Sequence, residues 1–376
     1  MIHDGRLSVI VSGMVCATPR QGGATWAALQ YVTGLRELGH DVMFVEQLSD
    51  EAVHPRACSY FEDAVAAFGL QDRAGLITAS GAAIGGVSRA AIERFAAGAD
   101  LLFNLSGTLT DEALLERIAL RVYVDLDPGF TQLWNEVDGV EMGFDRHHRF
   151  VTVGLAMTDG DAPTLGGGRS WTTTRQPVDL KRWPVAVQEV RPLLTSVGHW
   201  RGYGSITHEG TVYGQRAHSM RPLLSIASRA DIPIEFALGI DPAETADIDA
   251  LRRHGWLLAD PDRVAGTPAA YSDYVRSSWA ELGIAKSGYV QSKSGWFSDR
   301  SACYLASGRP VIAQETGFSD HLPTGTGLFS FCTVDQALEA IDAVRADYRR
   351  HSLAARQIAE DLFDSGPVLS GLIEAL

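Results

Sequence analysis

Short apolar runs without polar alternation recur along the chain, each followed by a polar or glycine-containing loop and then a helical stretch. Residues 7–13, 41–46, 101–107 and 121–125 are such runs in the first half. Strands covered on both faces read as continuous apolar segments, whereas strands with one wet face alternate. The pattern therefore predicts an α/β protein with parallel sheets that carry helices on both faces.

Residues 154–192 interrupt this rhythm with several prolines and glycines, and a second strand–helix series begins at residue 193. A chain of 376 residues is long for one hydrophobic core and sufficient for two. We expect one Rossmann-like domain over residues 1–185 and a second over 186–360. A ligand cleft would then lie between them, at the carboxyl ends of the strands.

Charge and cysteine content narrow the class of protein. The formal net charge of −14 argues against nucleic acid as a partner, because phosphate attraction needs a basic surface. Four scattered cysteines favour reduced thiols over disulfides. No apolar run approaches the ~20 residues of a transmembrane helix, and no signal peptide is evident. We expect a cytoplasmic protein, and a homodimer is left open.

Two loops in the second half have the composition of an anion site. Ser294 and Gly295 precede a helical stretch, and Thr316, Gly317 and Phe318 follow the next apolar run. Loops rich in backbone N–H groups bind anions, above all where one loop opens a helix. These five residues are therefore predicted to bind a diphosphate.

A glycine pair and a pair of carboxylates are the candidates in the first half. Gly22 and Gly23 lie between a strand and a helix, where a ligand loop and a plain tight turn are both open. Asp125 and Asp127 follow a strand, and period two places them on one side. One of them would act as general base towards a hydroxyl; alternatively, both hold the local turn.

The second half offers further polar candidates. Tyr203 and Ser205 follow a strand in a loop suited to phosphate or sugar, or to an ordinary strand-to-helix connection. Lys286 would neutralise a phosphate and Glu281 would accept a hydroxyl, unless the two simply form an ion pair at helical spacing. No spacing typical of metal ligands is evident, and neither a metal nor a cofactor is expected.

The segment from Ser294 to Phe318 resembles the donor-binding core of GT-B glycosyltransferases. The resemblance rests on Gly308-Arg309-Pro310-Val311-Ile312 with the following Thr316-Gly317-Phe318, and a longer string around 294–301 is similar to a poorly characterised bacterial glycosyltransferase-like branch. It implies a GT-B fold with two facing Rossmann-like domains, and a helix over residues 361–376 that crosses back to the first domain.

The resemblance also implies a function. The chain would transfer a hexose from a nucleotide-diphosphate sugar such as a UDP-sugar to a small-molecule or glycan acceptor, without a metal. Arg300 would offset the leaving-group charge, Asp299 would contact the donor, and Gly22 and Gly23 would face the acceptor. Cys303 stands where many GT-B enzymes carry a ribose-binding Glu, and the donor base, the acceptor and the stereochemistry are undecided. A nucleotide-sugar epimerase and a non-catalytic nucleotide-sugar-binding protein are the alternatives.

Overall fold

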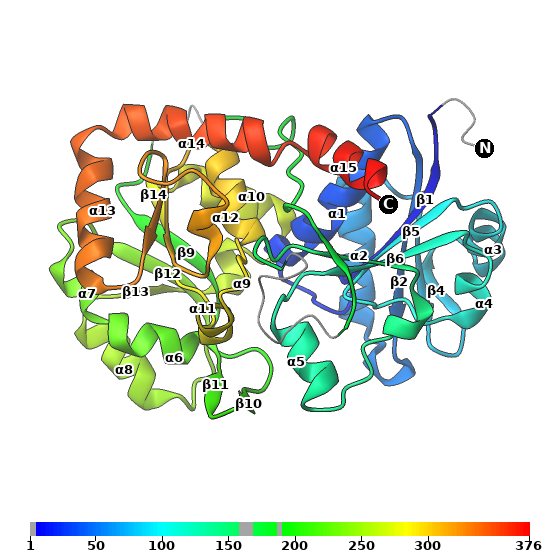
Figure 1. Ribbon diagram of the computed structural model, residues 1–376, viewed down its shortest axis with the longest axis horizontal. Helices are drawn as coiled ribbons and strands as arrows, with labels where there is room; N and C mark the ends of the chain where they lie inside the picture. The colour runs from blue at the N-terminus through cyan, green and yellow to red at the C-terminus, as the bar shows by residue number, and fades with distance from the viewer. Residues whose placement is uncertain (1–4, 158–167, 186–189) are drawn as a thin grey trace.

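Two large sheets, one in each half of the chain, organise the molecule (Figure 1). The computed structural model describes residues 5–157, 168–185 and 190–376. Part of the proline- and glycine-rich segment, with Pro163, Gly166 and Gly167, lies outside the described residues, as do residues 186–189 beside the expected domain boundary.

The first sheet has eight strands in the order β4-β3-β2-β1-β5-β6-β7-β8. All its neighbours pair in parallel except β3 with β4. Its strands are β1 (Ser8–Ser12), β2 (Asp41–Leu48), β3 (Ala74–Thr78), β4 (Ala83–Gly86), β5 (Leu101–Leu105), β6 (Leu120–Asp125), β7 (Arg149–Thr152) and β8 (Trp171–Thr173).

The second sheet has six strands, all parallel, in the order β13-β12-β9-β14-β15-β16. A small antiparallel hairpin, β10-β11, stands apart from it. These strands are β9 (Leu194–His199), β10 (Ile206–His208), β11 (Thr211–Tyr213), β12 (Ile234–Gly239), β13 (Leu257–Ala259), β14 (Ala280–Gly283), β15 (Val311–Gln314) and β16 (Leu328–Phe331).

Helices cover both faces of both sheets, so the strands carry the continuous apolar pattern seen in the sequence. The α-helices of the described residues are α1 (Gly22–Glu37), α2 (Pro55–Ala67), α3 (Arg89–Ala96), α4 (Glu112–Leu115), α5 (Phe130–Glu136), α6 (Arg216–Met220), α7 (Ser225–Arg229), α8 (Thr245–Arg253), α9 (Pro261–Val264), α10 (Pro268–Ser277), α11 (Ser287–Ser292), α12 (Asp299–Ala306), α13 (Val334–Ala346), α14 (Tyr348–Leu362) and α15 (Ser365–Glu374). None of them combines the length and hydropathy that a bilayer span requires.

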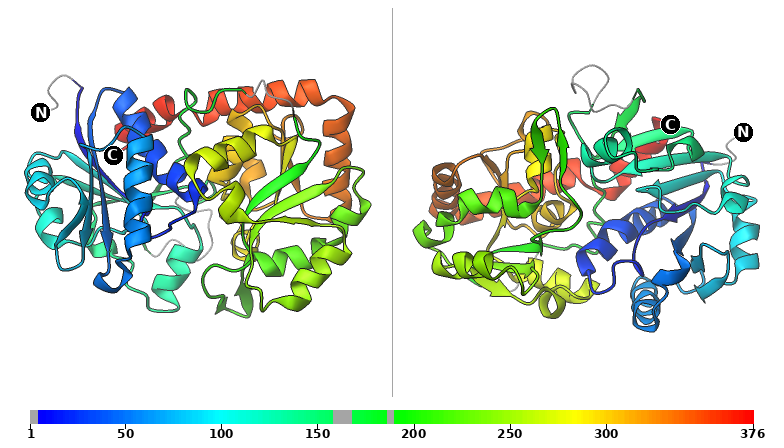
Figure 2. Two further views of the ribbon diagram at one scale, coloured as in Figure 1. Left: turned by 180° about the vertical axis from the view of Figure 1, so that it is seen from behind. Right: turned by 90° about the horizontal axis from the view of Figure 1, so that it is seen from below.

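The C-terminal helices connect the two halves. Helix α14 runs from the second sheet towards the first, and α15 lies against α1, as two of the views show (Figures 1 and 2). The contact is close, because a Cβ on Gly34 of α1 would stand 2.7 Å from the Leu369 side chain. The N–H of Ser365 also donates to the carbonyl of Val178. The last helix of the chain thus packs on the first half.

Strand β14 is followed by helix α11, which includes residues 287–290. Glu281 in the middle of β14 concealed the strand, because a charged residue is unusual in a buried run. Glu281 is fully buried and forms its ion pair with Arg300 of α12, not with Lys286.

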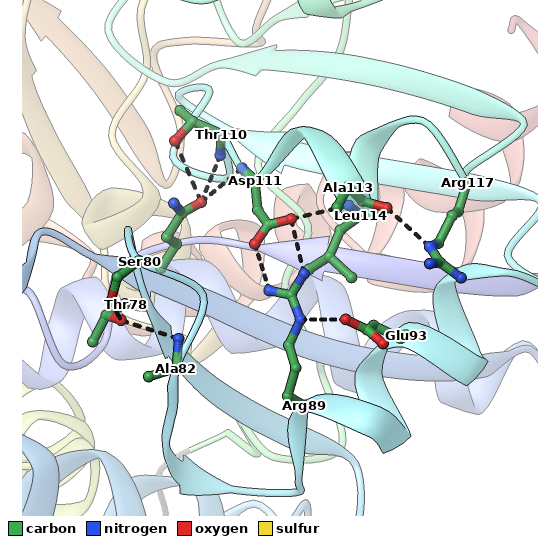
Figure 3. Close-up of polar contacts among 11 residues, drawn as sticks. Thr78, Ser80, Ala82, Arg89, Glu93, Thr110, Asp111, Ala113, Leu114 and Arg117 are labelled. Carbon is green, nitrogen blue, oxygen red and sulfur yellow. Dashed lines mark hydrogen bonds and ion pairs between the residues drawn. The ribbon is translucent and has the colours of Figure 1, made fainter.

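Polar contacts fix two loops at the carboxyl edge of the first sheet (Figure 3). Arg89 of α3 pairs with Asp111, which also caps α4, and with Glu93. The Gln47 side chain at the end of β2 accepts from the N–H of Thr110 at 2.7 Å. This network lies within the first half and holds the loop after β5 in place.

Candidate functional site

A cavity of about 380 Å³ lies between the two halves and is lined by residues of both. The first half contributes the loop from β1 to α1, the start of α1, and the ends of β5 and β6. The second half contributes the end of β9, the start of α6, and residues of α10, α11 and α12. Ligands of open α/β sheets bind outside the carboxyl ends of the strands, and this cavity lies there.

The start of α1 is docked on the second half. The Gly22 N–H donates to the carbonyl of Ala265 at 2.9 Å, and the Trp26 indole N–H donates to that of Pro268 at 2.8 Å. Gly22 has no room for a side chain, because a Cβ would stand 2.2 Å from the Thr267 carbonyl oxygen. Gly22 and Gly23 both line the cavity. The first turn of a helix has N–H groups without intrahelical partners and carries positive potential.

Three cationic side chains of the second half line the same cavity: Arg216, Lys286 and Arg300. Arg300 donates to Glu281 and, at 2.9 Å, to the carbonyl of Val197. Its charge is therefore compensated within the protein. Lys286 lies 3.4 Å from Asp127.

Arg216, the first residue of α6, has no acidic partner among the described residues. It donates to the carbonyls of Ile284 and His199, each at 2.8 Å, and both partners are neutral. Burial and the nearby Arg300 lower the pKa of Arg216 to about 9, which leaves it charged at neutral pH. A buried cation without a counter-charge is unfavourable, so an anion in the cavity would be stabilised there.

Asp127 links the two halves at the rim of this cationic group. Its carboxylate accepts from the hydroxyls of Tyr203, at 2.6 Å, and of Tyr289, and pairs with Lys286. Burial would raise the pKa of Asp127, but Lys286 and the two hydroxyls outweigh it and hold the pKa below its ordinary value. The Phe130 ring packs edge-on against both tyrosine rings. Asp127 lines the cavity as an ionised carboxylate.

Asp125 differs from Asp127 in its surroundings, although period two suggested a shared side. Asp125 is fully buried and is not among the cavity-lining residues. It accepts from Thr131 at 2.6 Å, Gln132 at 3.1 Å and Thr152 at 2.9 Å, and from the N–H of Asp127 at 3.0 Å. Burial raises its pKa to about 6. These contacts orient the loop that carries Asp127.

No group of three or more His, Cys, Asp or Glu side chains in the described part of the chain is arranged to hold a metal ion.

Comparison with known proteins gives no matching family model and no matching curated protein. Solved structures do match. Anabaena HepE, solved with UDP and glucose, has a TM-score of 0.61 at 12% identity, over 98% of this chain and 99% of its own. An alpha-glucosyltransferase solved with UDP and a 13-mer DNA has a TM-score of 0.60 at 12% identity, over 99% of each chain. AviGT4, a glycosyltransferase involved in Avilamycin A biosynthesis, has a TM-score of 0.56 at 14% identity, over 98% of this chain and 96% of its own.

These structures are GT-B glycosyltransferases. The chain has the GT-B fold. The expected fold class is thereby confirmed over almost the whole chain.

The two loops that were predicted to bind the diphosphate of a GT-B donor are bonded to each other and to their own neighbours. The Gly295 N–H donates to the Thr316 carbonyl at 2.8 Å, and the Thr316 and Gly317 N–H groups donate to the Glu315 carboxylate. None of these residues, nor Ser294, lines the cavity, and Phe318 borders only a much smaller void. The N–H groups of Gly295, Thr316 and Gly317 are therefore engaged within the protein.

Among the remaining predicted donor contacts, Lys286 and Asp299 line the cavity, whereas Tyr203 and Ser205 do not. Ser205 is exposed on the loop before β10, and Tyr203 acts on the cavity through Asp127. Cys303 is buried one turn after Asp299 on α12 and accepts from the Gln30 side chain. Asp299 is thus the carboxylate that α12 presents to the cavity of this GT-B fold.

Sequence reasoning missed Arg216. The available signal was its position at the first helical residue after β9, where side chains face the carboxyl edge of the sheet.

Proposed function

We propose that the chain is a glycosyltransferase that takes a sugar from a nucleotide-diphosphate sugar, and that the cavity between its halves is the donor site. One observation carries the proposal: Arg216, a buried cation with no acidic partner in the described part of the chain, lines a cavity between the two sheets of a GT-B fold. The HepE and alpha-glucosyltransferase neighbours were solved with UDP, and a UDP-sugar is the donor that we favour.

The diphosphate would lie between Arg216 and the start of α1. The guanidinium would offset the charge that develops on the leaving nucleotide, and Lys286 would add a second cation. The Gly22 N–H is bonded to Ala265, so the N–H groups of Gly23 and Ala24 in the first turn of α1 would donate to the opposite face of the diphosphate. In this arrangement Gly22 and Gly23 keep the backbone close enough to contact the ligand.

Two carboxylates would accept hydrogen bonds from hydroxyl groups, one of the donor and one of the acceptor. Asp299, on α12, would accept a hydrogen bond from a hydroxyl of the donor ribose. It would replace the ribose-binding Glu of many GT-B enzymes, whose position is occupied by Cys303 in this chain. Asp127 would accept from the attacking hydroxyl of the acceptor, and would serve as general base if the reaction inverts the anomeric centre. Asp125 would only position Asp127, because its oxygens are bonded within the protein.

The domains proposed for this activity are residues 1–185 on the acceptor side and 186–360 on the donor side. The segment 361–376 would tie the second to the first through its contact with α1.

A nucleotide screen tests the proposal. Thermal shift and calorimetry with UDP, TDP, GDP and their sugars should give saturable stabilisation by one base, and sugar release should follow with a suitable acceptor. Absence of binding by every nucleotide would refute the donor site. Turnover of the donor without any acceptor would favour the epimerase, and binding without turnover would favour a non-catalytic binding protein.

A further inference from the structure

Apolar side chains form one part of the cavity wall that the first half provides, beside the polar residues Thr18, Gln21, Ser106 and Gln176. Met14, Pro19 and Ala27 come from the β1–α1 segment and α1, and Leu105 and Leu126 lie at the ends of β5 and β6. Met14 is 41% exposed and belongs to the exposed large apolar residues of the described chain. Apolar surface that remains exposed in a concave site is typical of a place where a ligand covers it.

The two charged residues of this wall are compensated by the protein. Arg20 donates to Asp262 of α9 at 2.8 Å, and Asp127 is bonded by Lys286 and two tyrosine hydroxyls. Away from the start of α1, an anionic group brought against the described apolar side chains of this wall would lose its hydration and find no uncompensated cation there. Arg216, which has no carboxylate partner among the described residues, belongs to the opposite wall.

An aromatic pair stands where the two walls meet. The Trp296 ring stacks on the Tyr289 ring with centroids 4.0 Å apart and planes within 10°, and both residues line the cavity. Trp296 is partly exposed and also bridges to Gly154 of the first half. Rigid aromatic surface of this kind packs well against rings and hydrocarbon skeletons.

We propose that the acceptor is a neutral hydroxyl compound with an apolar ring or hydrocarbon skeleton, bound by Met14, Leu105, Leu126 and Trp296 with its hydroxyl towards Asp127. This inference rests on the proposed glycosyl transfer and names the acceptor class of that site. The reaction joins the acceptor oxygen to the sugar C1, breaks the bond from C1 to the diphosphate oxygen, and passes the hydroxyl proton to the carboxylate or to the leaving diphosphate.

A matched pair of probes tests the class at about pH 7, where naphthols are neutral. The ligand 2-naphthol carries only a ring and a hydroxyl, whereas 6-hydroxynaphthalene-2-sulfonate adds an anion to the same skeleton. Both are titrated into the full chain with and without UDP, and a 13-mer single-stranded DNA is included as a polyanionic probe. We expect 2-naphthol to bind saturably and at least about ten-fold more tightly than the sulfonate, a difference of ~1.4 kcal/mol.

Two variants locate the binding. Met14→Lys should lower the affinity for 2-naphthol by about five-fold and reduce the ratio of the affinities for 2-naphthol and the sulfonate, while UDP affinity stays the same. Leu353→Lys, which places the same charge on an exposed position of α14 away from the cavity, should change neither.

The outcomes separate this inference from the function on which it rests. UDP binding together with equal or tighter binding of the sulfonate or the DNA would overturn the acceptor class alone, and so would UDP binding with no affinity for 2-naphthol. Binding of 2-naphthol without any nucleotide binding would overturn the proposed function, and with it the role of that ligand as an acceptor.

Discussion

The two walls of the cavity differ in chemistry although each is made by the carboxyl edge of a similar parallel sheet. The wall of the second half presents Arg216, Lys286, Asp299 and Arg300, and that of the first half presents a group of apolar side chains, among them Met14, Leu105 and Leu126, beside polar ones. The difference shows that one architecture, used twice, can provide an anion-binding face and an apolar face through its loops alone. The proposed acceptor site uses the apolar side chains of the first half, and the proposed donor site uses the charged wall together with the start of α1.

The largest expected effect concerns the interior of the apolar wall. Glu46 of β2 is fully buried and accepts from the N–H groups of Val15, Cys16 and Ala17, which hold the β1–α1 segment in place. Burial raises its pKa to about 7 although the three N–H groups oppose the shift. The pKa of Glu46 is raised because its carboxyl group lies in an interior without water. If water reached the carboxyl group, its pKa would stay closer to the ordinary value.

A raised pKa means that the folded state binds more protons than the unfolded state between about pH 4.5 and 7. Compared with Glu46→Gln, the wild type should therefore lose free energy of unfolding as the pH rises through this window. The expected loss is about 3 kcal/mol, since each pKa unit is worth about 1.4 kcal/mol. Urea denaturation of both proteins at several pH values measures it, and a pH-independent difference would count against an interior without water at Glu46.

The second effect concerns the charged wall. Arg216→Gln should lower UDP affinity by about 30-fold, because a charge-assisted contact to phosphate contributes about 2 kcal/mol. Arg201→Gln is the matched control: Arg201 is exposed, pairs with Glu244 and does not line the cavity, so UDP affinity should stay the same. Calorimetry measures both, with a melting curve to confirm that each variant is folded. Equal effects of the two substitutions would mean that the wall acts only through general charge.

A smaller effect is expected where the walls meet. Asp127→Asn removes the carboxylate that holds Lys286, so Lys286 becomes available to the diphosphate. UDP affinity should rise by about three-fold, consistent with the modest energy of a partly exposed ion pair. Sugar transfer should fall at the same time, since the proposed contact to the acceptor hydroxyl is lost. A decrease in UDP affinity would show that Asp127 supports the donor site instead of competing with it.

The smallest effect should be that of Ser205→Ala. Ser205 is exposed and lies outside the cavity, so UDP affinity should change by less than about two-fold. A substantial loss of UDP affinity in the same calorimetric titration would mean that the loop before β10 also contributes to UDP binding.

The sequence predicted the fold more fully than the site. Unbroken apolar runs identified β1, β2, β5 and β6 because burial on both faces leaves a simple signature. Strand β14 was missed because buried Glu281 hides it, and its partner Arg300 is 19 positions away. The glycine loops at 295 and 317 were correctly seen as rich in N–H groups. Sequence could not show that these groups bond to Thr316 and Glu315, since such pairing depends on the tertiary arrangement.

The role of Arg216, like the hydrogen bonding of the two glycine loops, depends on the tertiary arrangement. Nothing in its local sequence distinguishes it from other arginines, and its meaning comes from burial, two neutral carbonyl partners and the absence of an ion pair with a described carboxylate. Asp299 was predicted as a donor contact from the resemblance, and the structure places it in the cavity lining at the start of α12, after the N-cap residue Ser298.

A crystal structure of the protein with UDP tests the central claim most directly, namely that the donor diphosphate lies on the charged wall. The account predicts phosphate oxygens within hydrogen-bonding distance of the Arg216 guanidinium and of the N–H groups of Gly23 and Ala24 in the first turn of α1. A diphosphate bound instead by residues 294–295 and 316–318, with their present hydrogen bonds broken, would contradict it.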